Sequence, residues 1–213
     1  MFNSKTSIAL ATLLLAGAAH AAAFTDGSFS EAASMGNSYG AVGYDGAGNT
    51  IGPWTLDSGS VDLIKSYWQL TPNGSYSVDM NGLTAGSISQ TFDLAAGTYV
   101  LSFYMAGNPD GSPASKSVDV SVGDQSLVPY TFVNSGQSEG NMGWTLETLK
   151  FTSTGATTLT FASTTGVGSS YSPFGAAIGG VTITSAVPEP ASLGLLLAGI
   201  GMLGVMSSRR RAR

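Results

Sequence analysis

The stretch Tyr99-Val100-Leu101-Ser102-Phe103-Tyr104-Met105-Ala106 decides the fold class, because every second side chain from Tyr99 to Met105 falls on one apolar face. Ser117-Val118-Asp119-Val120-Ser121-Val122 shows the same period of two, with valine alternating against serine and aspartate. This period, carried by β-branched and aromatic residues, is typical of half-buried antiparallel strands.

Similar short apolar runs recur along the middle of the chain, separated by turn residues such as Gly123-Asp124. No segment between the two ends has the stripe of an amphipathic helix. We therefore predict an all-β fold, an antiparallel β-sandwich of the jelly-roll type. The Gly-rich residues 32–53 and 164–175 are expected to be loops. The predicted strands are Ser87–Leu94, Tyr99–Ala106, Lys116–Val122, Ser126–Val133, Trp144–Phe151, Thr157–Ala162 and Ala177–Thr184.

The N-terminus predicts a secretory signal peptide over residues 1–23. Lys5 precedes an apolar run from Ile8 to Ala18, and small residues follow it. An apolar run of about 7–15 residues after a positive start is typical of a signal peptide and too short for a stable membrane span. Cleavage is expected after Ala21 or Ala23, which leaves residues 24–186 as the β-sandwich domain.

The C-terminus, residues 187–213, predicts a sorting and anchor tail. Pro188-Glu189-Pro190 is followed by the apolar run Leu193–Met206 and then by Arg209-Arg210-Arg211. The two prolines prevent a helix from extending backwards. The run is slightly short for a spanning helix, which needs about 17–25 residues, and the arginines would stay on the cytoplasmic side. A single hydrophobic helix is expected here.

The order of these elements resembles the PEP-CTERM sorting signal of Gram-negative bacteria. The resemblance implies that an exosortase cleaves near Pro188-Glu189-Pro190 after a transient insertion in the inner membrane. It also implies a cell-surface or extracellular-matrix location. An ordinary C-terminal membrane anchor has the same topology and keeps the tail.

Charge excludes one class of partner. Five of the eight basic residues and one of the thirteen acidic residues lie in the two terminal segments, so the exported part keeps three lysines against twelve carboxylates. Nucleic acid binding needs a cluster of cations, which this part lacks. Sparse charge favours neutral sugars over charged polymers as ligands.

The chain contains no cysteine, and its single histidine, His20, lies in the predicted signal peptide. Ser-His-Asp and Cys-His catalysis need a histidine base, and zinc and copper sites are built mainly from histidine and cysteine. These reaction classes are therefore excluded for the exported domain.

The blocks Trp54–Ile64, Ser77–Gly82, Gly86–Phe92 and Leu101–Asp110 resemble the choice-of-anchor C family. The resemblance implies a galactose-binding-like jelly roll, similar to a plant cell-wall family associated with polysaccharide. It implies little about activity.

A carbohydrate site is predicted at Tyr67 and Trp68, because adjacent strand residues face opposite sides and one ring should point outward. Aromatic rings stack on sugar faces, and amides bind the hydroxyls. The expected polar neighbours are Gln69, Asn73 and Asn81, whereas Trp54 and Trp144 are expected in the core.

The leading functional prediction is a non-catalytic carbohydrate-binding or exopolysaccharide-associated surface protein. The alternatives are a polysaccharide hydrolase or lyase that uses paired carboxylates, and a purely structural surface protein. Candidate acids are Asp57, Asp62, Asp79 and Asp110. No catalytic residue is assigned and no cofactor is expected, apart from a structural calcium ion for which Asp110 is the favoured ligand.

Overall fold

The computed structural model describes residues 23–31, 38–44 and 48–186. The predicted signal peptide, apart from its last residue, and the predicted sorting tail with its hydrophobic helix lie outside these residues. The described ranges contain strands, turns and bends but no helix. Accordingly, no helix there is long and apolar enough to cross a membrane.

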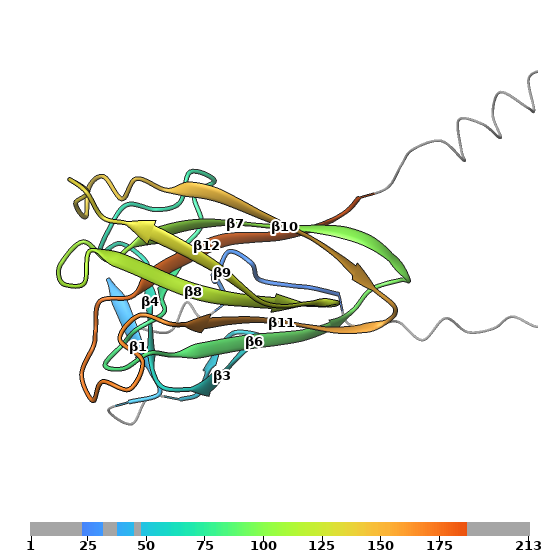
Figure 1. Ribbon diagram of the computed structural model, residues 1–213, viewed down its shortest axis with the longest axis horizontal. Coiled ribbons are helices and arrows are strands. Elements are labelled where there is room, and N and C mark those ends of the chain that lie inside the picture. The colour runs from blue at the N-terminus through green and yellow to red at the C-terminus, as the bar shows by residue number, and fades with distance from the viewer. Residues whose placement is uncertain (1–22, 32–37, 45–47, 187–213) are drawn as a thin grey trace, which may run out of the picture.

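The described chain is an antiparallel jelly-roll β-sandwich, which confirms the predicted fold class. Figure 1 shows its two sheets as two layers. Each sheet has six strands. The first sheet has the order β1 (Tyr39–Val42), β4 (Val61–Ile64), β5 (Ser77–Asp79), β12 (Ala176–Ser185), β7 (Gly97–Gly107), β10 (Thr145–Ser153). The second sheet has the order β2 (Thr50–Ile51), β3 (Trp54–Ser58), β6 (Ser87–Asp93), β11 (Ala156–Ser163), β8 (Ser115–Val122), β9 (Gln125–Val133).

The core lies between the sheets and is formed by the period-two faces of the strands. Leu101, Phe103 and Met105 of β7 are buried, and the ring of Phe103 meets that of Phe161 from β11 at 5.1 Å between centroids. The three valines of β8 are buried as well. Trp54 is fully buried, as predicted. Trp144 precedes β10 and packs, partly buried, against the core.

All seven predicted strands are present, within a few residues of their predicted ends. The prediction that residues 32–53 form a loop was wrong for two segments. Tyr39–Val42 pairs with β4, and Thr50–Ile51 pairs with β3. These strands are short and depend on their partners: β1 pairs with a strand about twenty residues further on, and β2 pairs with the adjacent β3 across Gly52 and Pro53. The expected loop at 164–175 contains no strand.

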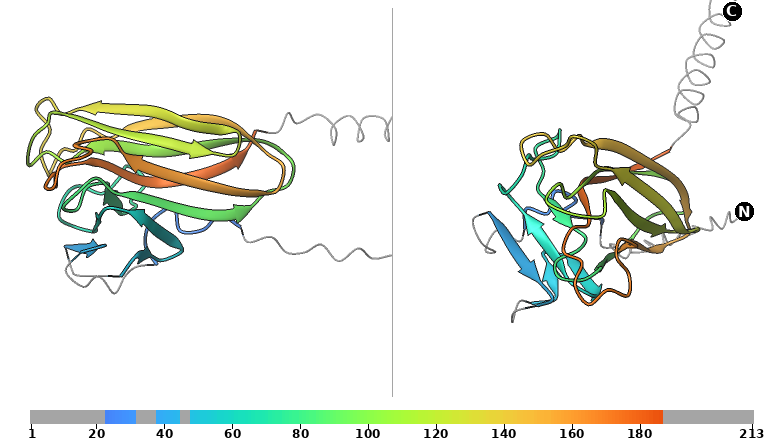
Figure 2. Two further views of the ribbon diagram at one scale, coloured as in Figure 1. Left: turned by 60° about the horizontal axis from the view of Figure 1, so that its bottom comes forward. Right: turned by 60° about the vertical axis from the view of Figure 1, so that its left-hand side comes forward.

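The two ends of the sandwich differ. Loops after β7 and before β12 lie at one end, beside β1 and β4, as Figure 2 shows. From there β12 runs along the first sheet between β5 and β7, pairing with β7 along its whole length and with β5 near its start. Its register against β7 shifts between Gly179 and Thr182, where Gly180 has a φ of +59°. The described chain ends just beyond β12, at Ala186 and the opposite end of the sandwich.

Candidate functional site

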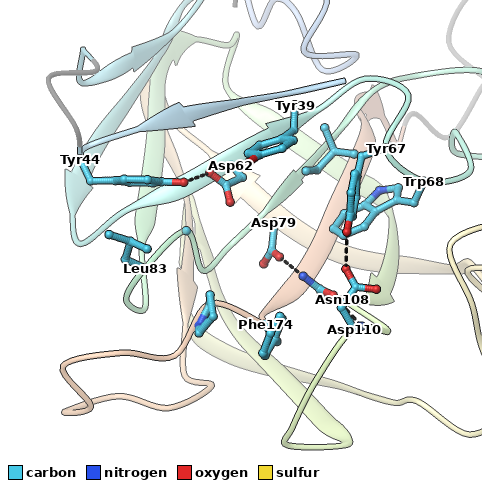
Figure 3. A pocket seen from close by; sticks show the side chains of 13 residues that line it. Tyr39, Tyr44, Asp62, Tyr67, Trp68, Asp79, Leu83, Asn108, Asp110 and Phe174 are labelled. Atoms are coloured by element: carbon cyan, nitrogen blue, oxygen red, sulfur yellow. Dashed lines mark hydrogen bonds between the residues drawn. The ribbon is translucent and has the colours of Figure 1, made fainter. Parts of the chain in front are cut away.

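A pocket of about 270 Å³ lies on the outer face of the first sheet, close to the loop end. Leu63 of β4 is fully buried in the core, so its neighbour Asp62 faces the other way. The same alternation places Val78 in the core and Asp79 on the pocket side of β5. Figure 3 shows Asp62 and Asp79 pointing into the same space.

Three aromatic side chains form one wall of the pocket. Tyr39 begins β1, whereas Tyr67 and Trp68 lie in a bend after β4. The ring centroids of Tyr39 and Tyr67 are 5.8 Å apart, and those of Tyr67 and Trp68 are 6.1 Å apart. Tyr39 is 51% exposed and Tyr67 38%, but Trp68 is only 4% exposed. The Trp68 indole N–H donates to Ser77 Oγ at 2.9 Å, which fixes the innermost ring.

One of the two predicted aromatic residues does point outward. It is Tyr67, and it belongs to a bend rather than to a strand, so the argument from strand alternation was wrong although the outward orientation was right. Leu83 and Phe174 line the pocket on the side opposite the aromatic wall, as Figure 3 shows.

Two carboxyl groups face each other across neighbouring strands. Asp62 of β4 and Asp79 of β5 are register partners, and opposed residues of an antiparallel pair lie about 4.5–5.5 Å apart at Cβ. The Tyr44 hydroxyl donates to Asp62 Oδ1 at 2.5 Å. Burial raises the pKa of Asp62, and the hydrogen bond from Tyr44 opposes this.

Asp79 is the most deeply buried acid of the pocket, with 1% of its surface exposed. Its Oδ1 accepts from the backbone N–H groups of Asn81 and Gly175, each at 3.0 Å, and its Oδ2 accepts from Asn108 Nδ2 at 2.7 Å. Burial raises its pKa to about 8; the hydrogen bonds oppose this shift, and the nearby Asp62 adds to it.

The loop after β7 supplies the third acid. Asp110 N–H donates to Asn108 Oδ1 at 2.9 Å, and this local hydrogen bond stabilises the loop conformation. The Tyr67 hydroxyl donates to Asp110 Oδ2 at 3.0 Å and connects the aromatic wall to this loop. That hydrogen bond, with a smaller contribution from burial, raises the pKa of Tyr67 to about 12.

Lys116 of β8 connects the loop after β7 with the loop before β12 through hydrogen bonds. Its side chain is fully buried, and its ammonium group donates to the carbonyl oxygens of Gly111 at 2.8 Å and Phe174 at 2.6 Å. The ammonium also lies 5.8 Å from the centroid of the Phe174 ring. Burial lowers its pKa to about 8, whereas Asp79 and Asp110 act in the opposite direction.

Five of the residues singled out in the sequence line the pocket: Tyr67, Trp68, Asp62, Asp79 and Asp110. Four others do not: Gln69, Asn73, Asn81 and Asp57. Gln69 Oε1 accepts from Met142 N–H at 3.0 Å. Asn73 Oδ1 accepts from Thr71 Oγ1 at 2.6 Å in a local turn. Asn81 is fully buried, and its amide donates to the carbonyl oxygens of Thr165 and Ser172. The three amide side chains form hydrogen bonds that stabilise loops, and they do not line the pocket.

Sequence reasoning missed Tyr39, Tyr44 and Phe174 as pocket residues. The only signal at these positions was an aromatic side chain within a Gly- and Ser-rich segment, where an aromatic residue has no local core to fill. Asp62 and Asp79 were considered as acids, but their pairing depends on the register between β4 and β5.

Calcium binding at Asp110 stays a prediction. Within the described ranges, no group of three or more His, Cys, Asp or Glu side chains is arranged to hold a metal ion. The processing motif Pro188-Glu189-Pro190 lies outside the described residues.

A second pocket, of about 410 Å³, lies at the opposite end of the sandwich, beside Ala186. It is lined mostly by small residues, together with Tyr99 and Lys150, and by no carboxylate. The first pocket is therefore the better candidate for a specific site, since it combines several rings with polar groups.

Several carbohydrate-binding modules of known structure are similar to the chain in fold. A native family 35 module from Clostridium thermocellum has 16% identity and a TM-score of 0.39, and the match covers 63% of this chain and 89% of that one. CBM61 in complex with beta-1,4-galactotriose has 18% identity, a TM-score of 0.41, and coverage of 62% and 88%. CBM36 in complex with calcium and xylotriose has 18% identity, a TM-score of 0.37, and coverage of 57% and 92%.

Comparison of the sequence with protein families gives two matches, whereas no curated protein matches the chain. Residues 186–211 match the PEP-CTERM protein-sorting motif, which indicates an exported surface protein that an exosortase processes. Membership of the choice-of-anchor C family stays a prediction. Residues 22–184, most of the chain, match the other family, so the chain belongs to the family described as "Protein of unknown function (DUF642)".

Proposed function

We propose that the exported domain is a non-catalytic carbohydrate-binding domain, and that its ligand enters the pocket beside Tyr39 and Tyr67. The observation that carries this proposal is the combination of two half-exposed rings at the mouth with Asp62, Asp110 and Asn108 inside. Sugars present flat apolar faces that pack on rings and hydroxyl groups that need hydrogen-bond partners. The pocket offers both within one concave surface.

The sorting motif supports an extracellular location for the proposed binding domain. We propose a Gram-negative host, a transient inner-membrane anchor formed by the tail, and an exopolysaccharide or cell-surface matrix as the partner. Residues 1–23, 24–186 and 187–213 would then act as signal peptide, binding domain and sorting tail. A pocket smaller than the about 300–1,000 Å³ typical of drug-sized ligands suits one sugar unit, so a single domain should bind weakly and gain avidity on a polymer.

Affinity electrophoresis in gels that contain soluble polysaccharides tests the proposal. Tyr67→Ala removes an exposed ring at the mouth, and it should abolish the retardation that wild type shows. Tyr171→Ala is the matched control, because Tyr171 is 66% exposed and does not line the pocket. If Tyr67→Ala and Tyr39→Ala both fold and are retarded like wild type, the site is wrong. If no gel retards wild type, the purely structural alternative gains.

A polysaccharide hydrolase or lyase is the second candidate, and the Asp62–Asp79 pair is the specific observation that favours it. Two carboxyl groups with raised pKa values resemble the acid and base of such enzymes. Three protein donors already occupy the Asp79 oxygens, which favours a fixed structural carboxyl group instead. New reducing ends or unsaturated products, released by wild type but not by Asp62→Asn, would establish the enzyme.

A further inference from the structure

The fold concentrates acidic side chains where the ligand is proposed to enter. Asp62, Asp79 and Asp110 line the pocket, and no lysine or arginine lines it. These acids come from β4, the end of β5 and the loop after β7. The exported part was expected to favour neutral sugars because its charges are sparse along the chain. In three dimensions, a quarter of its carboxyl groups meet at one site.

No cation is hydrogen-bonded to the buried acid of this site among the described residues. The groups that bond the Asp79 carboxyl are an asparagine amide and two backbone N–H groups, all of them neutral. Lys116 interacts electrostatically with Asp79 and Asp110, but its ammonium donates to two loop carbonyl groups instead. A carboxylate that is buried without an ion pair is costly, which is why burial raises the pKa of Asp79; a cation that entered the pocket would favour its ionised form.

The rings around the acids favour an organic cation over a bare metal ion. A metal needs several ligands that converge within coordination distance, and the described residues contain no such group of acidic, histidine or cysteine side chains. The spaces between the acids are bordered by rings, namely Tyr39, Tyr67, Trp68 and Phe174. Aromatic faces attract organic cations, and carboxylates accept their N–H groups.

We propose that the pocket selects a sugar that carries a free ammonium group, that is, an amino-sugar unit that is not N-acetylated. This inference rests on the proposed carbohydrate-binding function and names its ligand class. The ammonium group enters beside Asp62 and Asp110, and the sugar ring lies against Tyr67 and Tyr39 at the mouth. The natural ligand is then a polysaccharide with de-N-acetylated units.

Isothermal titration of the purified exported protein with two matched probes tests the inference. One probe is the β-1,4-linked glucosamine tetramer with free amines, and the other is its fully N-acetylated form, which has the same backbone and no charge. Near pH 6 the free amines are protonated. Wild type should bind the amine form about tenfold more tightly, and added salt should reduce this preference.

Three variants assign the preference to the pocket. Asp62→Asn keeps the shape of the side chain, can still accept from Tyr44, and should reduce the ratio of the two affinities to about twofold or less. Asp110→Asn should also reduce the ratio, and it lies in a loop where folding is less sensitive to substitution. Asp119→Asn, on β8 and away from the pocket, is the matched control and should keep the wild-type ratio.

The possible outcomes separate the two proposals. Equal affinity for both tetramers, or tighter binding of the acetylated form, would overturn the amino-sugar inference and leave carbohydrate binding in place. An unchanged ratio in Asp62→Asn and Asp110→Asn would show that the preference arises elsewhere on the surface. If neither tetramer binds but a neutral polysaccharide retards wild type in the gels, the inference fails and the proposed function stands. If neither tetramer binds and no gel retards wild type, both fail.

Discussion

Replacing Asp79 with asparagine tests whether the folded protein keeps a proton on this carboxyl group near neutral pH. Burial raises the pKa of Asp79 from 3.8 to about 8. Between these values the folded protein binds a proton that the unfolded chain has lost, so the free energy of unfolding falls as the pH rises. One such proton corresponds to about 1.4 kcal/mol per pH unit, so wild type should lose about 3 kcal/mol between about pH 5 and pH 7.

This pH window isolates the carboxyl pair. The exported part has no histidine, because His20 lies in the predicted signal peptide. The lowered pKa of Lys116, about 8, and the raised pKa of Tyr67, about 12, affect stability above the window. Burial also raises the pKa of Asp62, which changes the stability in the same direction as Asp79. Measuring Asp62→Asn as well therefore shows how much of the pH dependence of stability comes from each of the two carboxyl groups.

Urea denaturation at about pH 5, 6 and 7 measures the effect for wild type, Asp79→Asn and the control Asp119→Asn. At the lowest pH, Asp79→Asn should be less stable than wild type by about 1–3 kcal/mol. The NH₂ group that replaces Asp79 Oδ2 cannot accept the hydrogen bond from Asn108 Nδ2. Its stability should change little with pH, so the difference from wild type should shrink towards neutral pH. A wild-type free energy that stays flat across the window would refute the reasoning, and so would an equal slope in Asp79→Asn.

Four further predictions concern the core, the buried lysine, calcium binding and the C-terminal tail. Phe103→Ala should lower the free energy of unfolding by about 3–5 kcal/mol, since Phe103 is fully buried; an unchanged urea midpoint would contradict this. Lys116→Met should cost about 2–3 kcal/mol, because the carbonyl groups of Gly111 and Phe174 lose a charged donor; equal thermal unfolding of variant and wild type would argue against it. Calcium should raise the melting temperature of wild type but not of Asp110→Asn, and a chelator should reverse the rise; no rise in wild type removes the calcium prediction. Replacing both Pro188 and Pro190 with alanine should leave the tail attached, and intact-mass analysis that finds residues 191–213 on the wild-type surface protein would disprove processing.

The long strands could be predicted because each one buries one face. Leu101, Phe103 and Met105 carry the period of two in β7, and the valines carry it in β8. The first strands could not be predicted in the same way. Tyr39–Val42 contains one glycine among four residues, and its extended conformation depends on pairing with β4.

The site was predictable in part for a similar reason. Tyr67 could be picked out because it is adjacent to Trp68, and one ring of such a pair was expected to be exposed. The meeting of Asp62 with Asp79 depends on strand register, and β5 has only three residues to indicate it. Asn81 was expected to bind sugar because of its amide, but it follows a strand end and precedes a glycine, where asparagine commonly bonds backbone groups.

The course of β12 also determines how the protein would be presented on a cell. The strand begins two residues after Phe174 of the pocket and ends one residue before Ala186, where the sorting motif begins. Ten extended residues measure about 30 Å, so the strand separates the binding site from the attachment point by that distance. A protein held by its tail would therefore present the pocket at its outermost end. The proposed binding pocket and Ala186 lie at opposite ends of the sandwich, so a polymer bound in the pocket would not obstruct cleavage of the tail.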